Sequence, residues 1–192
     1  MQISQNGINL IKTFEGCRLT SYRCPSGVWT IGYGHTEGVT EGRTITQETA
    51  EQILKSDLHK FEHYVETYAK KYGYELNQSQ FDALVSFTYN AGPGNLDRRL
   101  LLKGKRPIEL IRLYLPTTCI SSKGKTLPGL VRRRVAEADL MGNCLKPLNK
   151  VAEEVLDGRW GNGAERKKQL TDVGYSYTAV QAEVNRLLEE KK

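Results

Sequence analysis

Three side chains near the N-terminus, Glu15, Cys24 and Thr30, offer groups that can take part in acid–base or nucleophilic chemistry. A carboxyl group can donate a proton, an ionised thiol can act as a base or a nucleophile, and a hydroxyl can donate and accept hydrogen bonds. All three lie within one segment, Phe14 to His35, which reads FEGCRLTSYRCPSGVWTIGYGH. We expect a helix end and a hairpin in this segment to hold the acid opposite the polar groups across a cleft.

The acid falls at the end of a predicted helix. Residues 4–15 carry apolar side chains at helical spacing, and Gly16 is a typical residue just after a helix end. Glu15 therefore lies in the last turn, where the helix dipole disfavours a negative charge. This position suits a carboxyl group that must hold a proton in order to donate it.

The thiol and the hydroxyl belong to a predicted hairpin over residues 19–35. The turn cluster Pro25-Ser26-Gly27 separates two segments rich in β-favouring residues. Strand alternation sets Thr30 and Trp29 on opposite faces of the second strand. Residues 39–44 are expected to add a third strand.

The remainder of the chain has the pattern of helices in two groups. Apolar stripes of the first group predict helices that start at Thr46 and Asn77 and helices over residues 96–103, 107–115 and 129–141, with a polar loop at 116–128. The second group is a set of three short helices after residue 147. Its length of about 45 residues is near the lower limit for a unit that folds alone.

The composition is that of an ordinary globular protein, with 39% hydrophobic and 26% charged residues. The net charge of +6 lies almost wholly in residues 1–145. Such a charge suits an anionic polymer or surface as a partner, and simple solubility explains it equally well. We find no nucleic-acid-binding motif, no apolar run that could cross a membrane and no secretory signal. The four cysteines lack the spacing of a structural zinc site, and no metal or organic cofactor is expected.

The segment from Phe14 to His35 resembles the phage-type lysozymes of glycoside hydrolase family 24. That family carries glutamate, eight residues, aspartate or cysteine, five residues and threonine, which this chain matches with Glu15, Cys24 and Thr30. The TIGYGH run that follows is a further family feature. The Asn-Ala-Gly segment at residues 90–92 and the GLVRRRVAE segment from residue 129 extend the resemblance to about Asn143.

The resemblance implies an α+β fold with a two-lobed lysozyme-like domain over residues 1–143. A long helix would join a small β-hairpin lobe to a helical lobe. Residues 144–147 would form a linker. Residues 148–192 are similar to the CW-type (Cpl-7-like) cell-wall-binding repeat, whose core pattern G-x-W-G-N-G-x-x-R-x-x-x-L-x-x-x-G-Y is present. This repeat is expected to form a small three-helix bundle that binds peptidoglycan.

The resemblance also implies roles for the three chemical groups. Glu15 donates a proton to the glycosidic oxygen, Cys24 takes the position of the usual aspartate, and Thr30 helps to hold the attacking water. An ordinary thiol, with a pKa of about 8.5, is mostly uncharged at neutral pH. Cys24 therefore leaves three alternatives open: a base or nucleophile with a lowered pKa, a buried structural thiol, or a disulfide partner of Cys17.

Other residues are candidates for contact with the polymer. In the lysozyme-like part these are Gly32, His35 and Arg133. A structural role is the alternative for His35, and a solvated basic face is the alternative for Arg133. In the repeat the candidates are Trp160, Asn162, Arg166 and Tyr175. A place in the core explains Trp160 as well as a sugar-stacking role does.

Together these observations predict a phage endolysin that hydrolyses the β-1,4 bonds between N-acetylmuramic acid and N-acetylglucosamine and so lyses the host cell. We expect a monomer whose partner is bacterial peptidoglycan, with no nucleic acid and no stable membrane insertion. It would be made in the host cytoplasm and released through a holin. A non-catalytic peptidoglycan-binding protein and a lytic transglycosylase, which needs the acid but no water-positioning group, are the alternatives.

Overall fold

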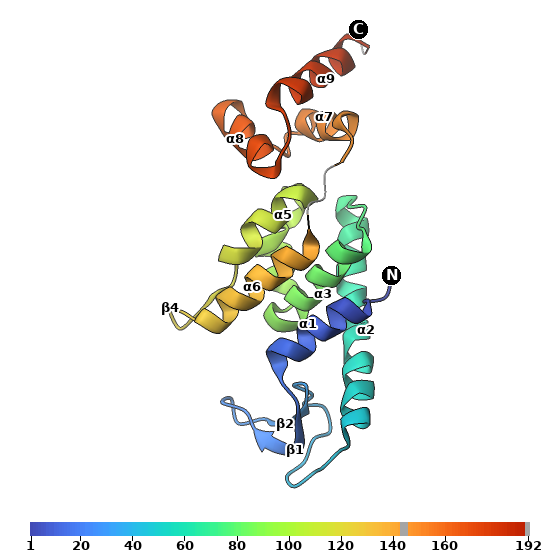
Figure 1. Ribbon diagram of the computed structural model, residues 1–192, viewed down its shortest axis with the longest axis vertical. Helices are drawn as coiled ribbons and strands as arrows, with labels where there is room; N and C mark the ends of the chain where they lie inside the picture. The colour runs from blue at the N-terminus through green and yellow to red at the C-terminus, as the bar shows by residue number, and fades with distance from the viewer. Residues whose placement is uncertain (143–145, 191–192) are drawn as a thin grey trace. The chain divides into compact units, whose positions relative to one another are not determined.

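The computed structural model describes residues 1–142 and 146–190 (Figure 1). Contacts divide the chain into two compact units, Met1–Pro93 and Gly94–Lys192, which we call the N-terminal and C-terminal units. Cys144 and the first half of the predicted linker at 144–147 lie outside the described residues. The predicted domain boundaries rest on sequence patterns and stay predictions.

The N-terminal unit combines a helical layer with a hairpin. Its elements are α1 (Gln5–Glu15), β1 (Arg18–Arg23), β2 (Trp29–Gly32), α2 (Gln47–Tyr72) and α3 (Gln78–Ala91). Helix α3 packs against both α1 and α2, and β2 packs against α2 near its first residues (Figure 1). The side chains that are fully buried in this unit include Ile11, Leu54, Leu58, Phe81 and Phe87.

The ends of these helices follow from local sequence. The side chains of Ser4, Thr46 and Asn77 accept hydrogen bonds from backbone N–H groups in the first turns of α1, α2 and α3. Asn77 and Gln80 form a reciprocal capping box. The predicted helix starts at Thr46 and Asn77 are confirmed. Because these caps fix where α1 and α2 begin, they also fix the positions of the side chains along them.

The hairpin has an irregular register. The paired residues are Arg18 with Gly32, Tyr22 with Thr30 and Arg23 with Trp29, with a bulge between the first two pairs. The expected third strand over 39–44 is wrong, because only an isolated bridge between Thr20 and Thr44 joins that region to β1. Gly38 and Gly42 adopt positive φ angles of 64° and 71°, so turns replace the extended backbone that a strand needs.

The C-terminal unit is mainly helical. After α4 (Pro93–Asn95) it contains η1 (Leu96–Leu100), η2 (Leu102–Gly104), α5 (Ile108–Tyr114), η3 (Leu115–Thr117), β3 (Ser121–Ser122), β4 (Lys125–Thr126), α6 (Pro128–Met141), α7 (Leu148–Leu156), α8 (Gly163–Val173) and α9 (Tyr177–Glu189). The single helix expected over 96–103 is wrong. Leu102 and Lys103 have φ angles of 48° and 55°, which break the segment into a π-helical and a 3₁₀ turn. The three helices predicted after residue 147 are confirmed.

The three helices of the repeat share a core with α5. Trp160 is fully buried among apolar residues of α7, α8 and α9, and it meets Tyr175 edge to face at a centroid distance of 5.8 Å. Leu110 of α5 belongs to the same cluster, and Leu113 and Tyr114 pack against it. The repeat therefore buries part of its apolar surface against α5. Across the described residues, no helix combines the length and the apolar character that crossing a membrane requires.

Candidate active site

Glu15 is the last residue of α1 and is half-buried. Gly16 ends the helix with a φ angle of 66°, and its N–H donates to the carbonyl of Lys12 at 3.1 Å. A Cβ atom at Gly34 would lie 3.8 Å from Oε2 of Glu15 and 3.7 Å from the hydroxyl of Tyr89. The backbone of Gly34 thus runs beside the carboxyl group. Glycine keeps that space open and tolerates the local φ angle of 99°.

The carboxyl group of Glu15 lines a cavity of about 230 Å³ in the N-terminal unit. The wall also carries the charged residues Glu37, Asp57 and Lys60 and the aromatic residues Phe61 and Tyr89. Hydrogen-bonding groups beside aromatic rings suit a polar ligand such as a sugar. No group of three or more His, Cys, Asp or Glu side chains in the described ranges is arranged to hold a metal ion.

His35 lines the same cavity and ties the glycine-rich turn to α2. Its Nδ1 lies 2.8 Å from Oδ2 of Asp57, and its Nε2 lies 2.9 Å from the carbonyl oxygen of Glu37. The backbone of His35 also exchanges two hydrogen bonds with Ile31, at 2.9 and 3.0 Å. Both ring nitrogens are therefore engaged by the protein, which favours the structural alternative for His35. Its contact with substrate stays a prediction.

We expect His35→Asn to lower the free energy of unfolding by about 1–3 kcal/mol, because the mostly buried carboxyl group of Asp57 then loses its hydrogen bond to the imidazole. Urea unfolding at neutral pH measures this. His59→Asn is the matched control: His59 also pairs with an acid, Glu62, but its side chain is 66% exposed, against 17% for His35. Equal decreases in the free energy of unfolding would show that the contact with Asp57 stabilises the fold no more than the exposed pair of His59 and Glu62 does.

Cys24 and Thr30 flank the tight loop between β1 and β2. The backbone N–H of Cys24 donates to the carbonyl of Val28 at 3.0 Å, and the N–H of Gly27 donates to the carbonyl of Cys24 at 2.8 Å. The Thr30 hydroxyl donates to the carbonyl of Val28 at 3.1 Å. The Cys24 sulfur lies 2.9 Å from the hydroxyl oxygen of Ser26. The loop thus places two hydroxyl groups and a thiol together.

This loop changes the acidity of the thiol. The hydrogen bond from Ser26 is the largest cause that lowers the pKa of Cys24. Backbone hydrogen bonds at Val28 and Ser26 and the Thr30 hydroxyl add to it, and the pKa falls to about 7. Thiolate and thiol are then present in comparable amounts near neutral pH. Cys17 and Cys24 are both free thiols, so the disulfide alternative is not realised. The first alternative, a thiol with a lowered pKa, is the one that this geometry favours.

Gly32 and Arg133 lie in packed surroundings. A Cβ atom at Gly32 would be 3.5 Å from that of Ala50, so this glycine lets β2 approach the start of α2. Arg133 is 3% exposed, and its Nε lies 3.1 Å from Oε1 of Glu137 on the same helix, α6. The alternative of a solvated basic face is therefore wrong for Arg133. Substrate contact by either residue stays a prediction.

The four candidate residues of the repeat divide into two kinds. Trp160 is fully buried and its indole N–H donates to Glu154 at 3.1 Å, while Tyr175 is 7% exposed. Stacking on a sugar needs an accessible ring face, so the core alternative explains Trp160 better. Asn162 and Arg166 lie nearer the surface, where Nη2 of Arg166 donates to Oδ1 of Asn162 at 3.0 Å. These two can meet a ligand without unfolding the repeat.

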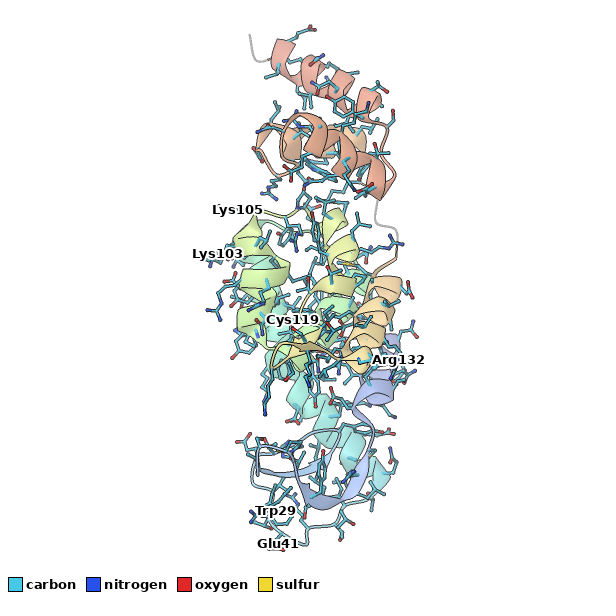
Figure 2. The ribbon with its side chains drawn as sticks, turned by 90° about the vertical axis from the view of Figure 1, so that its left-hand side faces the viewer. Trp29, Glu41, Lys103, Lys105, Cys119 and Arg132 are labelled. Carbon is cyan, nitrogen blue, oxygen red and sulfur yellow. The ribbon has the colours of Figure 1, made fainter. Side chains whose placement is uncertain are left out.

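Two arginine–aromatic stacks on the hairpin were not predicted. The guanidinium of Arg18 lies 4.3 Å from the ring centroid of Tyr22, and that of Arg23 lies 5.1 Å from the ring centroid of Trp29. Figure 2 labels Trp29 among the side chains of the N-terminal unit. Residues 18 and 22 would lie about 13 Å apart along a regular strand, so the bulge between them brings these two side chains together. Residues 23 and 29 face each other only in the observed register. Ser26, Gly34 and Asp57 are the other site residues that sequence reasoning passed over.

Comparison with known proteins identifies two families that match parts of this chain. The family model described as phage lysozyme matches residues 12–137, and the CW_7 repeat model matches residues 149–188. An endolysin of Acyrthosiphon pisum secondary endosymbiont phage 1 is 37% identical over 147 residues, which cover 73% of this chain and 97% of the relative. An endolysin of Lactococcus phage c2 is 42% identical over 149 residues, but the match spans only 60% of that longer protein.

Solved structures give the same result. The muramidase domain of SpmX from Asticaccaulis excentricus superposes with a TM-score of 0.60 at 34% identity, covering 76% of this chain and 99% of that domain. The predicted α+β class and both resemblances, to the lysozymes and to the repeat, are confirmed. With the model match spanning most of the chain, the protein belongs to the phage lysozyme family of muramidase-type enzymes and carries a CW_7 repeat after its lysozyme part.

Proposed function

We propose that this protein is an endolysin that hydrolyses the β-1,4 bond between N-acetylmuramic acid and N-acetylglucosamine, with Glu15 as the general acid. The observation that carries the proposal is the position of Glu15, half-buried at a helix end and lining a polar cavity. Membership of the phage lysozyme family supports the reaction class. Glu15 donates its proton to the glycosidic oxygen as the bond from that oxygen to the sugar C1 breaks.

Cys24 supplies the second group of the reaction. A water molecule adds to C1, and its proton passes to the Cys24 thiolate, which is well populated near neutral pH because its pKa is about 7. The Thr30 hydroxyl, beside Cys24 on the hairpin, helps to hold that water. A thiolate is a weaker electrostatic match for a sugar cation than a carboxylate, but it is a competent base. The lowered pKa of Cys24 therefore argues against the non-catalytic alternative.

The repeat directs the enzyme to its polymer. Peptidoglycan is the binding target that the CW_7 repeat supports, and we assign the contact to the surface pair Asn162 and Arg166. We further propose that the protein acts as a monomer, is made in the host cytoplasm and reaches the wall through pores formed by a holin. The family membership and the repeat support action at the wall.

Product analysis of digested peptidoglycan tests the reaction. Hydrolysis leaves N-acetylmuramic acid with a free reducing end, because water has added to C1. We expect mass spectrometry of borohydride-treated products to show only reduced muramitol ends. A lytic transglycosylase instead forms an anhydro sugar that borohydride does not reduce. Anhydro products as the main species would overturn the hydrolytic proposal, and an absence of any product would restore the non-catalytic alternative.

A further inference from the structure

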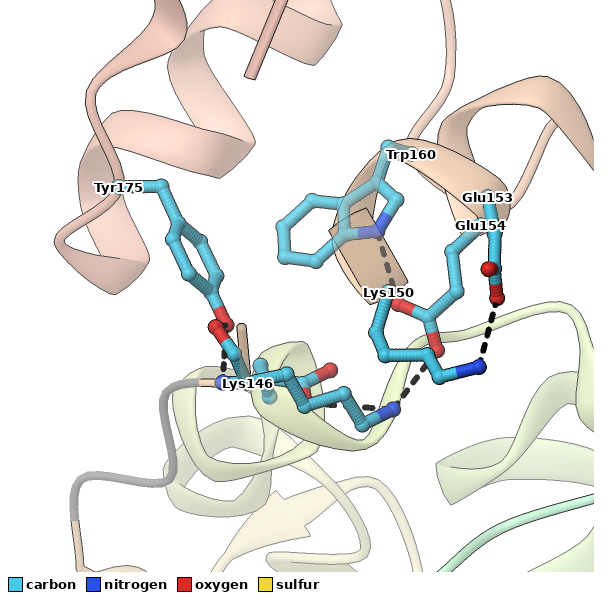
Figure 3. Close-up of polar contacts among 7 residues, drawn as sticks. Lys146, Lys150, Glu153, Glu154, Trp160 and Tyr175 are labelled. Atoms are coloured by element: carbon cyan, nitrogen blue, oxygen red, sulfur yellow. Dashed lines mark hydrogen bonds and ion pairs between the residues drawn. The ribbon is translucent and has the colours of Figure 1, made fainter. Parts of the chain in front are cut away.

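A largely buried group of charged side chains lies where the repeat packs on α5. Nζ of Lys146 is 2.7 Å from Oε1 of Glu154 on α7 (Figure 3) and 3.3 Å from Oε1 of Glu109 on α5. The side chain of Glu109 is fully buried, and that of Glu154 is 11% exposed. One ammonium group therefore forms ion pairs with two carboxyl groups that are mostly shielded from water.

The two carboxyl groups are satisfied unequally. Glu154 accepts hydrogen bonds from Lys146 and from the indole N–H of Trp160, which Figure 3 shows as dashed lines. Both oxygens of Glu109 are buried and accept no hydrogen bond. An ionised carboxylate in such a place is costly, and the remaining ion pair does not replace its lost hydration. Burial is the main cause that raises the pKa of Glu109, and Glu154 adds to it, while Lys146 acts in the opposite direction.

Lys146 belongs structurally to the repeat. Its backbone N–H donates to the hydroxyl of Tyr175 at 2.5 Å, and its ammonium group holds Glu154 (Figure 3). Leu110, next to Glu109 on α5, lies in the same apolar cluster as Trp160. Separation of the repeat from α5 would therefore take Lys146 and Glu154 away together. It would give Glu109 access to water and uncover Leu110.

We propose that Glu109, Lys146 and Glu154 form a proton-dependent latch that docks the repeat on α5 while Glu109 is protonated and weakens that docking once Glu109 ionises. In the docked form the cluster holds one positive and one negative charge. Ionisation of Glu109 adds a second negative charge without adding a hydrogen bond for it. The separated form has no such penalty, because water solvates the carboxylate.

The sign of the pH dependence follows from proton linkage. An acid whose pKa is raised in the docked form binds more protons docked than separated. Docking is therefore most favourable below the ordinary value of 4.5. It weakens as the pH rises from there toward the raised pKa of Glu109, and it is constant above that pKa.

The charged side chains on the other elements that pack on α5 do not act on the titration of Glu109. The α7–α8 turn and α8 contribute Arg159 and Glu165 to a separate cavity of about 210 Å³, which they share with Lys105 and Arg106. The buried arginines of α6 pair with Glu137 on α6 itself. Helix η3 carries no charged residue. Lys146 and Glu154 are therefore the charges that determine how Glu109 titrates.

Fluorescence of Trp160 in the full-length chain tests the latch without substrate. The chain has two tryptophans, so Trp29→Phe leaves Trp160 as the single reporter. Acrylamide quenching is measured from about pH 4 to about pH 9, a range that brackets the ordinary and raised titration of a glutamate. We expect quenching to increase as the pH rises. With Glu109→Gln added, we expect the pH dependence to be lost and quenching to stay low, because glutamine is uncharged throughout.

Two further variants keep the test decisive. Glu153→Gln removes an acid that neighbours Glu154 but is 51% exposed and pairs with Lys150, so its quenching profile should match that of the Trp29→Phe background. Lys146→Gln leaves both buried carboxyl groups without their cation and should move the rise in quenching to lower pH. Hydrogen exchange of the α5 amides should rise in parallel, which separates undocking from loss of structure within the repeat alone. A flat profile in the background, or equal profiles for the background and Lys146→Gln, would overturn the proposal.

Discussion

Glu15→Gln is expected to slow the cleavage of purified bacterial walls by about 10²–10⁴-fold, the usual contribution of a general acid. Glutamine preserves the size of the side chain and its place at the end of α1, but it has no proton to transfer to the glycosidic oxygen. The loss should appear in the turnover number measured by the fall in turbidity. Wall binding should persist, because the contacts that we assign to the repeat are distant in sequence from this residue.

The control for this experiment is Glu41→Gln, which removes an exposed carboxyl group from the same unit. Its activity should equal that of the wild type, and both variants should show the same circular dichroism spectrum. Retention of full activity by Glu15→Gln would mean that another group protonates the leaving oxygen. The mechanism proposed for this site would then be wrong.

Cys24→Asp is expected to retain activity and to move the acid limb of the pH–rate profile down by about three pH units. In the wild type the base that we propose is a thiol with a pKa of about 7, so the rate should fall as the pH drops below 7 and the thiolate gains a proton. An aspartate with an ordinary pKa of about 3.9 stays ionised to much lower pH. The measurement is kcat/KM on soluble peptidoglycan fragments, in reducing buffer, as a function of pH.

Cys17→Ser is the matched control for Cys24→Asp, because Cys17 is also a half-buried free thiol near the hairpin. Its pH profile should be that of the wild type. Cys24→Ala, which has no ionisable group, should lose activity across the whole range. An acid limb that stays near pH 7 in Cys24→Asp would assign the titration to another group and remove Cys24 from the role of base.

Those features of the site that depend on residue type and on local secondary structure could be predicted from the sequence. Glu15 falls at a helix end because Gly16 can adopt a positive φ angle there, and this could be read from the chain. The placement of Thr30 on the opposite face from Trp29 follows from strand alternation. The acidity of Cys24 could not be predicted, because it depends on the hydroxyl of Ser26 lying 2.9 Å away inside a particular loop.

The partners in contacts between distant segments could not be identified from the sequence. The pairing of His35 with Asp57 joins a turn to the middle of α2, and no local pattern specifies it. The pairing of Arg133 with Glu137, four residues apart on α6, follows helical spacing, but the burial of both side chains depends on the packing around α6. The same holds for Glu109, whose apolar neighbours and single cation become visible only when α5 and the repeat are packed together.

The place of Leu110 in the core of the repeat matters for anyone who builds chimeric enzymes from this chain. A fusion that transplants residues 148–192 alone leaves behind part of the apolar surface that normally covers Trp160. A bundle of this size has little stability to spare. A chimera should therefore carry α5 together with the repeat. The alternative is to replace with polar residues the apolar side chains of the repeat that Leu110 covers in this chain.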